Sequence, residues 1–173
     1  ALTGIYRVTN EAHCRFDAIS RSYKYVIYKQ KDPFMVNRGW LYPFPLNMEL
    51  LHRMAEILKD YDDFSSFSKR NTQVKTFICS IGTSTWEMKE DGSLIYHISA
   101  NRFLRGMIRG IVGTMVRIAR MDISVQEGEA MFRGVIEAKD CTQADFSTPA
   151  KGLFLETVMY PEGMLQVIED GNV

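Results

Sequence analysis

The 173-residue sequence contains few cysteines and histidines, and neither type is clustered. Neighbouring cysteines are more than sixty residues apart, and no Cys-x-x-Cys pair occurs. Zinc sites and disulfide frameworks both need closely spaced ligands or partners, so we expect reduced thiols, no metal and no structural disulfide. The residues concerned are Cys14, Cys79, Cys141, His13, His52 and His97.

Long hydrophobic runs are also missing. No apolar stretch approaches the roughly 20 residues that cross a bilayer. The first residues, Ala-Leu-Thr-Gly-Ile-Tyr, lack the basic and apolar regions of a signal peptide. The sequence therefore predicts a soluble, cytoplasmic protein with no membrane partner.

An excess of charge of one sign is absent as well. Lys plus Arg is 21 and Asp plus Glu is 21, which excludes a uniformly basic nucleic-acid binder but permits a basic stripe on one face. The hydrophobic fraction, 46%, is typical of a chain that buries a core. We therefore expect one globular domain.

The order of the expected elements indicates an α+β fold. Aromatic and β-branched residues over 22–28 predict a strand, and Asn47 can cap a helix with Leu51, Met54, Ala55 and Leu58 on its apolar side. A hairpin is expected from 74–88 and 94–99, a capping box at Ser124 and Glu127 predicts a second helix, and a last strand covers 152–160. The proline-rich stretch 31–45 reads as an aromatic-bearing loop. We expect an antiparallel or mixed β-sheet with helices packed on one face.

Residues 101–120 combine arginine and glycine in a helical pattern. Turning by about 100° per residue places five arginines within an arc of roughly 120°, opposite an apolar side. Three glycines point the same way, so we expect something to approach this backbone closely. An ordinary solvated face is one interpretation, and a surface where arginines meet phosphates or a buried carboxylate is the other. The arginines are Arg102, Arg105, Arg109, Arg117 and Arg120, and the glycines are Gly106, Gly110 and Gly113. Arg109, flanked by glycines, is the best candidate for a buried role.

Two tyrosines share one face of the first strand. Tyr23 and Tyr25 are two residues apart, so either could present its ring to a base, although a tyrosine-rich strand is more often core. The geometry does not separate the two. The Pro/Gly loop over 146–152 could line a pocket floor before Leu153, or it could be a plain strand entry.

Taken together, four segments resemble the tRNA pseudouridine synthase A family in order and spacing. They cover nearly the whole chain. They are Ala12-His-Cys-Arg-Phe-Asp-Ala-Ile-Ser-Arg-Ser-Tyr-Lys-Tyr25, Asp63-Phe-Ser-Ser-Phe-Ser68, Phe103-Leu-Arg-Gly-Met-Ile-Arg-Gly-Ile-Val-Gly113 and Thr148-Pro-Ala-Lys-Gly-Leu-Phe-Leu155.

The resemblance implies isomerisation of uridine to pseudouridine in the tRNA anticodon stem-loop, by a homodimer and without a cofactor. It implies that Tyr23 packs on the target base, that Arg109 orients a catalytic aspartate and that Leu153 helps enclose the base. Tyr25, Arg102 and Arg105 are further candidates for substrate binding.

The family's nucleophilic aspartate lies in an Arg-Thr-Asp type of motif, and this sequence contains none. Asp17 belongs to a different motif and is not a substitute. We therefore expect residues 1–173 to be a single C-terminal domain of the enzyme, inert without the N-terminal domain that carries the nucleophile. The alternative is a non-catalytic RNA-binding or dimerisation module.

Overall fold

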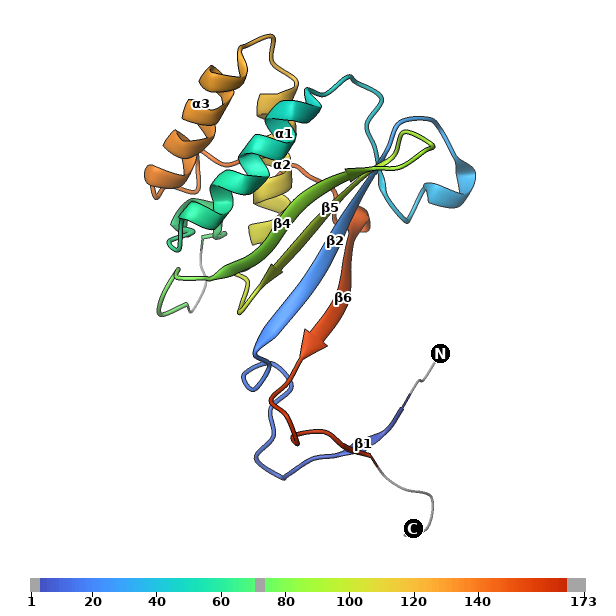
Figure 1. The fold of residues 1–173 in the computed structure, drawn as a ribbon, viewed down its shortest axis with the longest axis vertical. Coiled ribbons are helices and arrows are strands. Elements are labelled where there is room, and N and C mark those ends of the chain that lie inside the picture. Colours follow the sequence, from blue (N-terminus) through green and yellow to red (C-terminus); the bar gives the residue numbers. More distant parts are fainter. Residues whose placement is uncertain (1–3, 71–73, 168–173) are drawn as a thin grey trace.

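A computed structural model describes residues 4–70 and 74–167, which fold around a five-stranded mixed sheet (Figure 1). Its strands are β2 (Ser20–Tyr28), β3 (Trp40–Leu41), β4 (Ile81–Met88), β5 (Leu94–Ala100) and β6 (Leu153–Met159). The order β4–β5–β2 is antiparallel, and the other side of β2 pairs antiparallel with β6 and parallel with β3. A separate ribbon of β1 (Tyr6–Arg7) and β7 (Gln166–Val167) extends away from the sheet (Figure 1). The α+β fold and the mixed sheet are confirmed.

Three α-helices lie on one face of this sheet (Figure 1). They are α1 (Met48–Ile57), α2 (Met107–Ala119) and α3 (Val125–Glu137). Asn47 caps α1, since its side-chain oxygen accepts the Leu50 N–H at 3.0 Å. Ser124 and Glu127 form the predicted capping box at the start of α3. Both helix starts expected from the sequence are confirmed.

The core lies between the helices and the sheet. The predicted apolar side of the first helix is buried in it, from Leu51 to Leu58. Trp86 of β4 reaches across to α2, where its indole N–H donates to Met115 Sδ at 3.4 Å. Such contacts hold α2 against the sheet, and α2 carries Arg109.

The helix predicted over 101–120 is shorter than expected. Gly106 has φ +82°, a left-handed conformation that side chains rarely adopt, and α2 begins only at Met107. Arg102 and Arg105 therefore lie in the loop between β5 and α2. The prediction of one five-arginine helix face is wrong.

Two other expected boundaries differ. The stretch 31–45 is mostly loop, but it holds the short helix Pro33–Met35 and strand β3, whose Trp40 pairs with Ile27 of β2. The hairpin strand expected from Val74 begins at Ile81. The hairpin itself is confirmed, with β4 and β5 antiparallel.

Candidate functional site

Tyr23 lies half-buried beside a surface hollow of about 590 Å³, called here the Tyr23 hollow. Its ring packs edge-on against Phe103, with the two ring centroids 5.3 Å apart. The pairing of β2 with β6 shifts register between Ser22 and Tyr23. Such irregularities re-aim side chains and are common next to active sites. The hollow is lined by Arg15, Phe16, Ala18, Ile19, Arg21, Tyr23, Asn101, Arg102 and Phe103.

This lining contains three arginines and no acidic residue. Arg21 is held by the chain itself, since its guanidinium donates to the carbonyls of Asn101, at 3.1 Å, and Arg15. Over residues 4–70 and 74–167, neither Arg15 nor Arg102 forms an ion pair with a carboxylate. Two positive charges without acidic partners lie next to aromatic rings. This combination suits a nucleotide, in which a phosphate is joined to an aromatic base.

Tyr25 occupies a different environment from Tyr23. Its ring is fully buried, and its hydroxyl donates to the Pro149 carbonyl at 2.7 Å. A buried ring whose hydroxyl is already bonded has no free face for a base. The candidate role of Tyr25 in substrate binding is therefore corrected to a role in the core, and Tyr23 remains the tyrosine that can meet a ligand.

Arg109 of α2 points toward the 145–149 segment, which precedes β6. Its Nε–H donates to the Thr148 carbonyl at 2.6 Å, and one terminal nitrogen lies 3.5 Å from the Phe146 carbonyl. In the part of the chain that the structure describes, no carboxylate pairs with Arg109. These two carbonyls orient the guanidinium while leaving it without a neutralising charge.

The other arginines of α2 also contact the chain itself. Arg117 donates to the Gln143 carbonyl at 2.9 Å, and Arg120 lies over the Phe44 ring, 4.1 Å from its centroid. What approaches the glycines of α2 is likewise protein, because a Cβ built on Gly110 would lie 2.7 Å from the Phe146 ring. The close approach expected at these glycines is therefore made by the protein itself, while Arg117 and Arg120 remain exposed. This side of α2 packs on residues 143–148, and the exposed Arg105 and half-buried Arg102 precede it.

Leu153 is the first residue of β6 and pairs directly with Tyr25. It is partly buried and packs against the core. Arg109 and Tyr25 thus both bond to the segment 145–149, and Leu153 lies beside Tyr25 in the sheet. The structure brings these three predicted residues together, while Tyr23 lies two residues further toward the start of β2.

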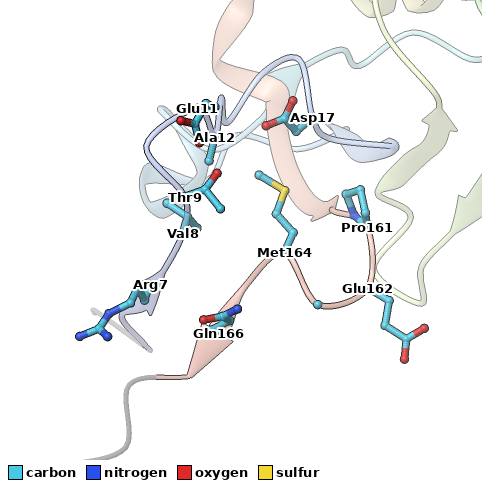
Figure 2. A pocket seen from close by; sticks show the side chains of 11 residues that line it. Arg7, Val8, Thr9, Glu11, Ala12, Asp17, Pro161, Glu162, Met164 and Gln166 are labelled. Atoms are coloured by element: carbon cyan, nitrogen blue, oxygen red, sulfur yellow. The ribbon is translucent and has the colours of Figure 1, made fainter. Parts of the chain in front are cut away.

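A second hollow, of about 750 Å³, lies between residues 7–17 and 161–166. Figure 2 shows Met164 pointing into the space between the two arms, with Arg7 and Glu162 directed away from it. Asp17 lies at its edge and accepts the His13 N–H at 2.7 Å, which ties this carboxylate into a local turn. None of the predicted site residues lines this hollow.

The described ranges contain no group of three or more His, Cys, Asp or Glu side chains placed to hold a metal ion. Burial raises the pKa of the Cys79 thiol to about 11, although the nearby Arg102 charge acts in the opposite direction. Across 4–70 and 74–167, no helix is long and apolar enough to cross a bilayer.

Sequence reasoning did not single out Arg15, Arg21, Asn101 or Phe103 as site residues. Arg15 and Arg21 precede Tyr23 within the segment 12–25, and Asn101 and Phe103 flank Arg102. Their proximity follows from the antiparallel pairing of β2 and β5, in which Arg21 pairs with Ala100. Pairing the two predicted strands in that register brings both segments to one end of the sheet.

Comparison with known proteins gives one consistent result. The sequence model of a family described as tRNA pseudouridine synthase matches residues 57–161. The tRNA pseudouridine synthase A of Parabacteroides distasonis is 42% identical over 96% of this chain and 64% of its own length. The enzyme of Bacteroides fragilis is 40% identical over 94% of this chain and 63% of its own length. The enzyme of Bacteroides thetaiotaomicron is 44% identical over 91% of this chain and 59% of its own length. The chain therefore spans about 60% of the length of these relatives, and it belongs to the tRNA pseudouridine synthase family.

Proposed function

We propose that this chain is the C-terminal domain of a tRNA pseudouridine synthase that isomerises uridine in the anticodon stem-loop of tRNA. The observation that carries the proposal is the Tyr23 hollow, where a half-buried aromatic ring lies beside Arg15 and Arg102 and no carboxylate lines the wall. Aromatic rings bind unstacked bases, and arginine binds phosphate. A base inside a helical stem is reached only after it leaves the stack.

In this proposal the reaction breaks the bond between N1 of uracil and C1′ of ribose, forms a bond between C5 and C1′, and moves the C5 proton off the base while N1 gains one. Tyr23 packs on the target base and assists the proton transfer. Arg109 orients the nucleophilic aspartate, and Leu153 helps enclose the base. Arg102 and Arg105 contact RNA phosphates.

The nucleophile comes from the remainder of the full-length protein, because this chain has no Arg-Thr-Asp motif and spans about 60% of its relatives. Arg109 fits this role, since its guanidinium is oriented by two carbonyls and carries no carboxylate partner among the described residues. The full-length enzyme works as a homodimer in the cytoplasm, without a cofactor.

Release of tritium from tRNA labelled at C5 of uridine tests the proposal. We expect the full-length protein to release tritium, and residues 1–173 alone to release none. Arg109→Ala and Tyr23→Ala in the full-length protein should each lower the rate by about a hundredfold or more. Arg133→Ala is the matched control, because Arg133 of α3 is already paired with Asp60, at 3.0 Å. Tritium release by the 173-residue chain, or a wild-type rate in Arg109→Ala, would contradict the assignment.

A further inference from the structure

The 145–149 segment is tied to the rest of the protein from two sides. From α2, the Thr114 hydroxyl accepts the Asp145 N–H at 2.9 Å, and Arg109 donates to the Thr148 carbonyl at 2.6 Å. From β2, the Tyr25 hydroxyl donates to the Pro149 carbonyl at 2.7 Å. The segment is therefore held between a helix and a strand, and Arg109 is one of its contacts.

The backbone couples the orientations of the Thr148 and Pro149 carbonyl groups. Thr148 and Pro149 are neighbours, the peptide bond between them is planar, and the proline ring fixes φ of Pro149, which is −63°. Only ψ of Pro149 is a soft torsion between the two carbonyl groups. A bond that fixes the Pro149 carbonyl therefore also limits the direction of the Thr148 carbonyl.

Thr148 has no second anchor of its own. Its side-chain oxygen is buried and has no hydrogen-bond partner in the described part of the chain. A Cβ on Gly113 would clash with this oxygen and with the Asp145 carbonyl, so the segment already lies against the helix backbone. The hydrogen bond from Tyr25 is thus the side-chain contact that fixes the end of the segment next to Arg109, where Pro149 also begins the short helix Ala150–Gly152.

The Tyr25 hydroxyl is suited to donate. Burial raises the pKa of Tyr25, and the Arg109 charge offsets this only in part. The hydroxyl is therefore protonated at neutral pH and available as a donor to a carbonyl. Gly152 makes room for the ring, since a Cβ there would lie 2.7 Å from Tyr25 Cζ.

We infer that Tyr25 is a positioning residue: its hydroxyl fixes Pro149, Pro149 fixes the Thr148 carbonyl, and that carbonyl aims the guanidinium of Arg109. The inference rests on the proposed function, in which Arg109 orients the nucleophile. Tyr25 itself touches no substrate. Its removal leaves Arg109 present and charged but free to turn.

The test is Tyr25→Phe in the full-length enzyme, with Tyr96→Phe as the control. Tyr96 pairs directly with Tyr25 in the sheet, is also fully buried, and shares a 2.7 Å hydrogen bond with Ser84 that does not involve the 145–149 segment. Both variants lose one buried hydrogen bond, so their losses of stability should be similar. Only Tyr25→Phe should change the orientation of the Arg109 guanidinium.

Two readouts are measured for each variant. In the tritium assay we expect Tyr25→Phe to lower kcat by about ten- to a hundredfold while KM for tRNA changes by less than about twofold. In NMR spectra of the full-length protein, the Nε–H of Arg109 should be protected from solvent exchange in wild type and in Tyr96→Phe. Tyr25→Phe should lower this protection by about tenfold or more.

Unchanged protection of the Arg109 Nε–H in Tyr25→Phe would overturn the inference. Equal losses of kcat in Tyr25→Phe and Tyr96→Phe would overturn it too, since they would reflect stability alone. If the wild-type protein released no tritium, the proposed function would fail, and the NMR signal would still decide whether Tyr25 positions Arg109.

Discussion

Tyr25 and Tyr96 stand directly opposite each other on β2 and β5, both fully buried, yet their hydroxyls bond to different parts of the protein. Tyr25 donates to the loop before β6, whereas Tyr96 shares a 2.7 Å hydrogen bond with Ser84 on β4. One tyrosine links the sheet to the candidate site, and the other links two strands of the sheet.

The pair Ser84 and Tyr96 gives a stability prediction. Ser84→Ala leaves the Tyr96 hydroxyl buried without a partner, which costs about 1–3 kcal/mol in the free energy of unfolding. The double variant with Tyr96→Phe should recover part of that loss, because neither polar group then remains. Urea denaturation of all three variants measures this coupling. Strictly additive losses would show that the two hydroxyls do not interact.

Two helical glycines should respond to alanine in opposite directions. Gly113→Ala in α2 places a Cβ against the Asp145 carbonyl and Thr148, so the backbone must move, and we expect a loss of about 1–3 kcal/mol. Gly134→Ala in α3 meets nothing within 4 Å and should stabilise the protein by about 0.5–1 kcal/mol. Denaturant titration checks both values. A wild-type stability for Gly113→Ala would mean that the 145–149 segment does not lie against α2.

Asp63 should contribute a pH-dependent term to stability. Burial alone would raise the pKa of this carboxyl, but hydrogen bonds from Lys139, at 2.9 Å, and Ser65 outweigh it and lower the pKa below its ordinary value. The unfolded state then binds more protons near pH 4, so the stabilisation is present above that pH and is lost as pH falls through the folded-state pKa. Asp63→Asn should make the free energy of unfolding fall less steeply as the pH is lowered from about pH 7 to pH 3, which unfolding curves at several pH values measure.

Lys139→Gln is the companion variant for the same experiment. It removes one of the two groups that lower the pKa of Asp63, so it should reduce the pH dependence of the free energy of unfolding only partly. Curves for wild type and Asp63→Asn that run parallel over this pH range would show that Asp63 is not involved.

Arg102 and Arg105 should contribute to RNA binding by charge. In the full-length protein, Arg102→Ala and Arg105→Ala should each weaken tRNA binding and make the plot of log K against log salt shallower by about one unit. Arg53→Ala is the control, since Arg53 is paired with Glu129 at 2.6 Å. Filter binding at several salt concentrations measures the slopes. Slopes equal to that of wild type in both variants would remove these arginines from the RNA interface.

Much of the fold could be predicted because it depends on local signals. The cap at Asn47 and the box at Ser124 are short-range hydrogen-bonding patterns, and the aromatic and β-branched residues over 22–28 favour a strand. The extent of α2 could not be read in this way. The helical spacing of arginines continues back to Arg102, but the helix begins only after Gly106, which has a left-handed conformation. The periodicity of side chains does not reveal the conformation of a single residue.

Some side chains of the candidate site were predictable, but their partners were not. Arg109 stood out by its position among glycines, but the groups that orient it are the backbone carbonyls of Phe146 and Thr148. Every residue has such a carbonyl, so the sequence contains no sign of which ones are used. Tyr23 and Tyr25 share a strand face, and only the packing of residue 149 on one of them separates the two.

The bonds that orient Arg109 also set the order in which the site can form during synthesis. The two carbonyls lie 37 and 39 residues further along the chain than Arg109 itself. At the usual pace of about 5–20 residues per second, the ribosome needs on the order of several seconds to make that stretch. Helix α2 therefore emerges before the groups that aim its arginine, and a nascent chain can have a folded helix while this part of the site is still incomplete.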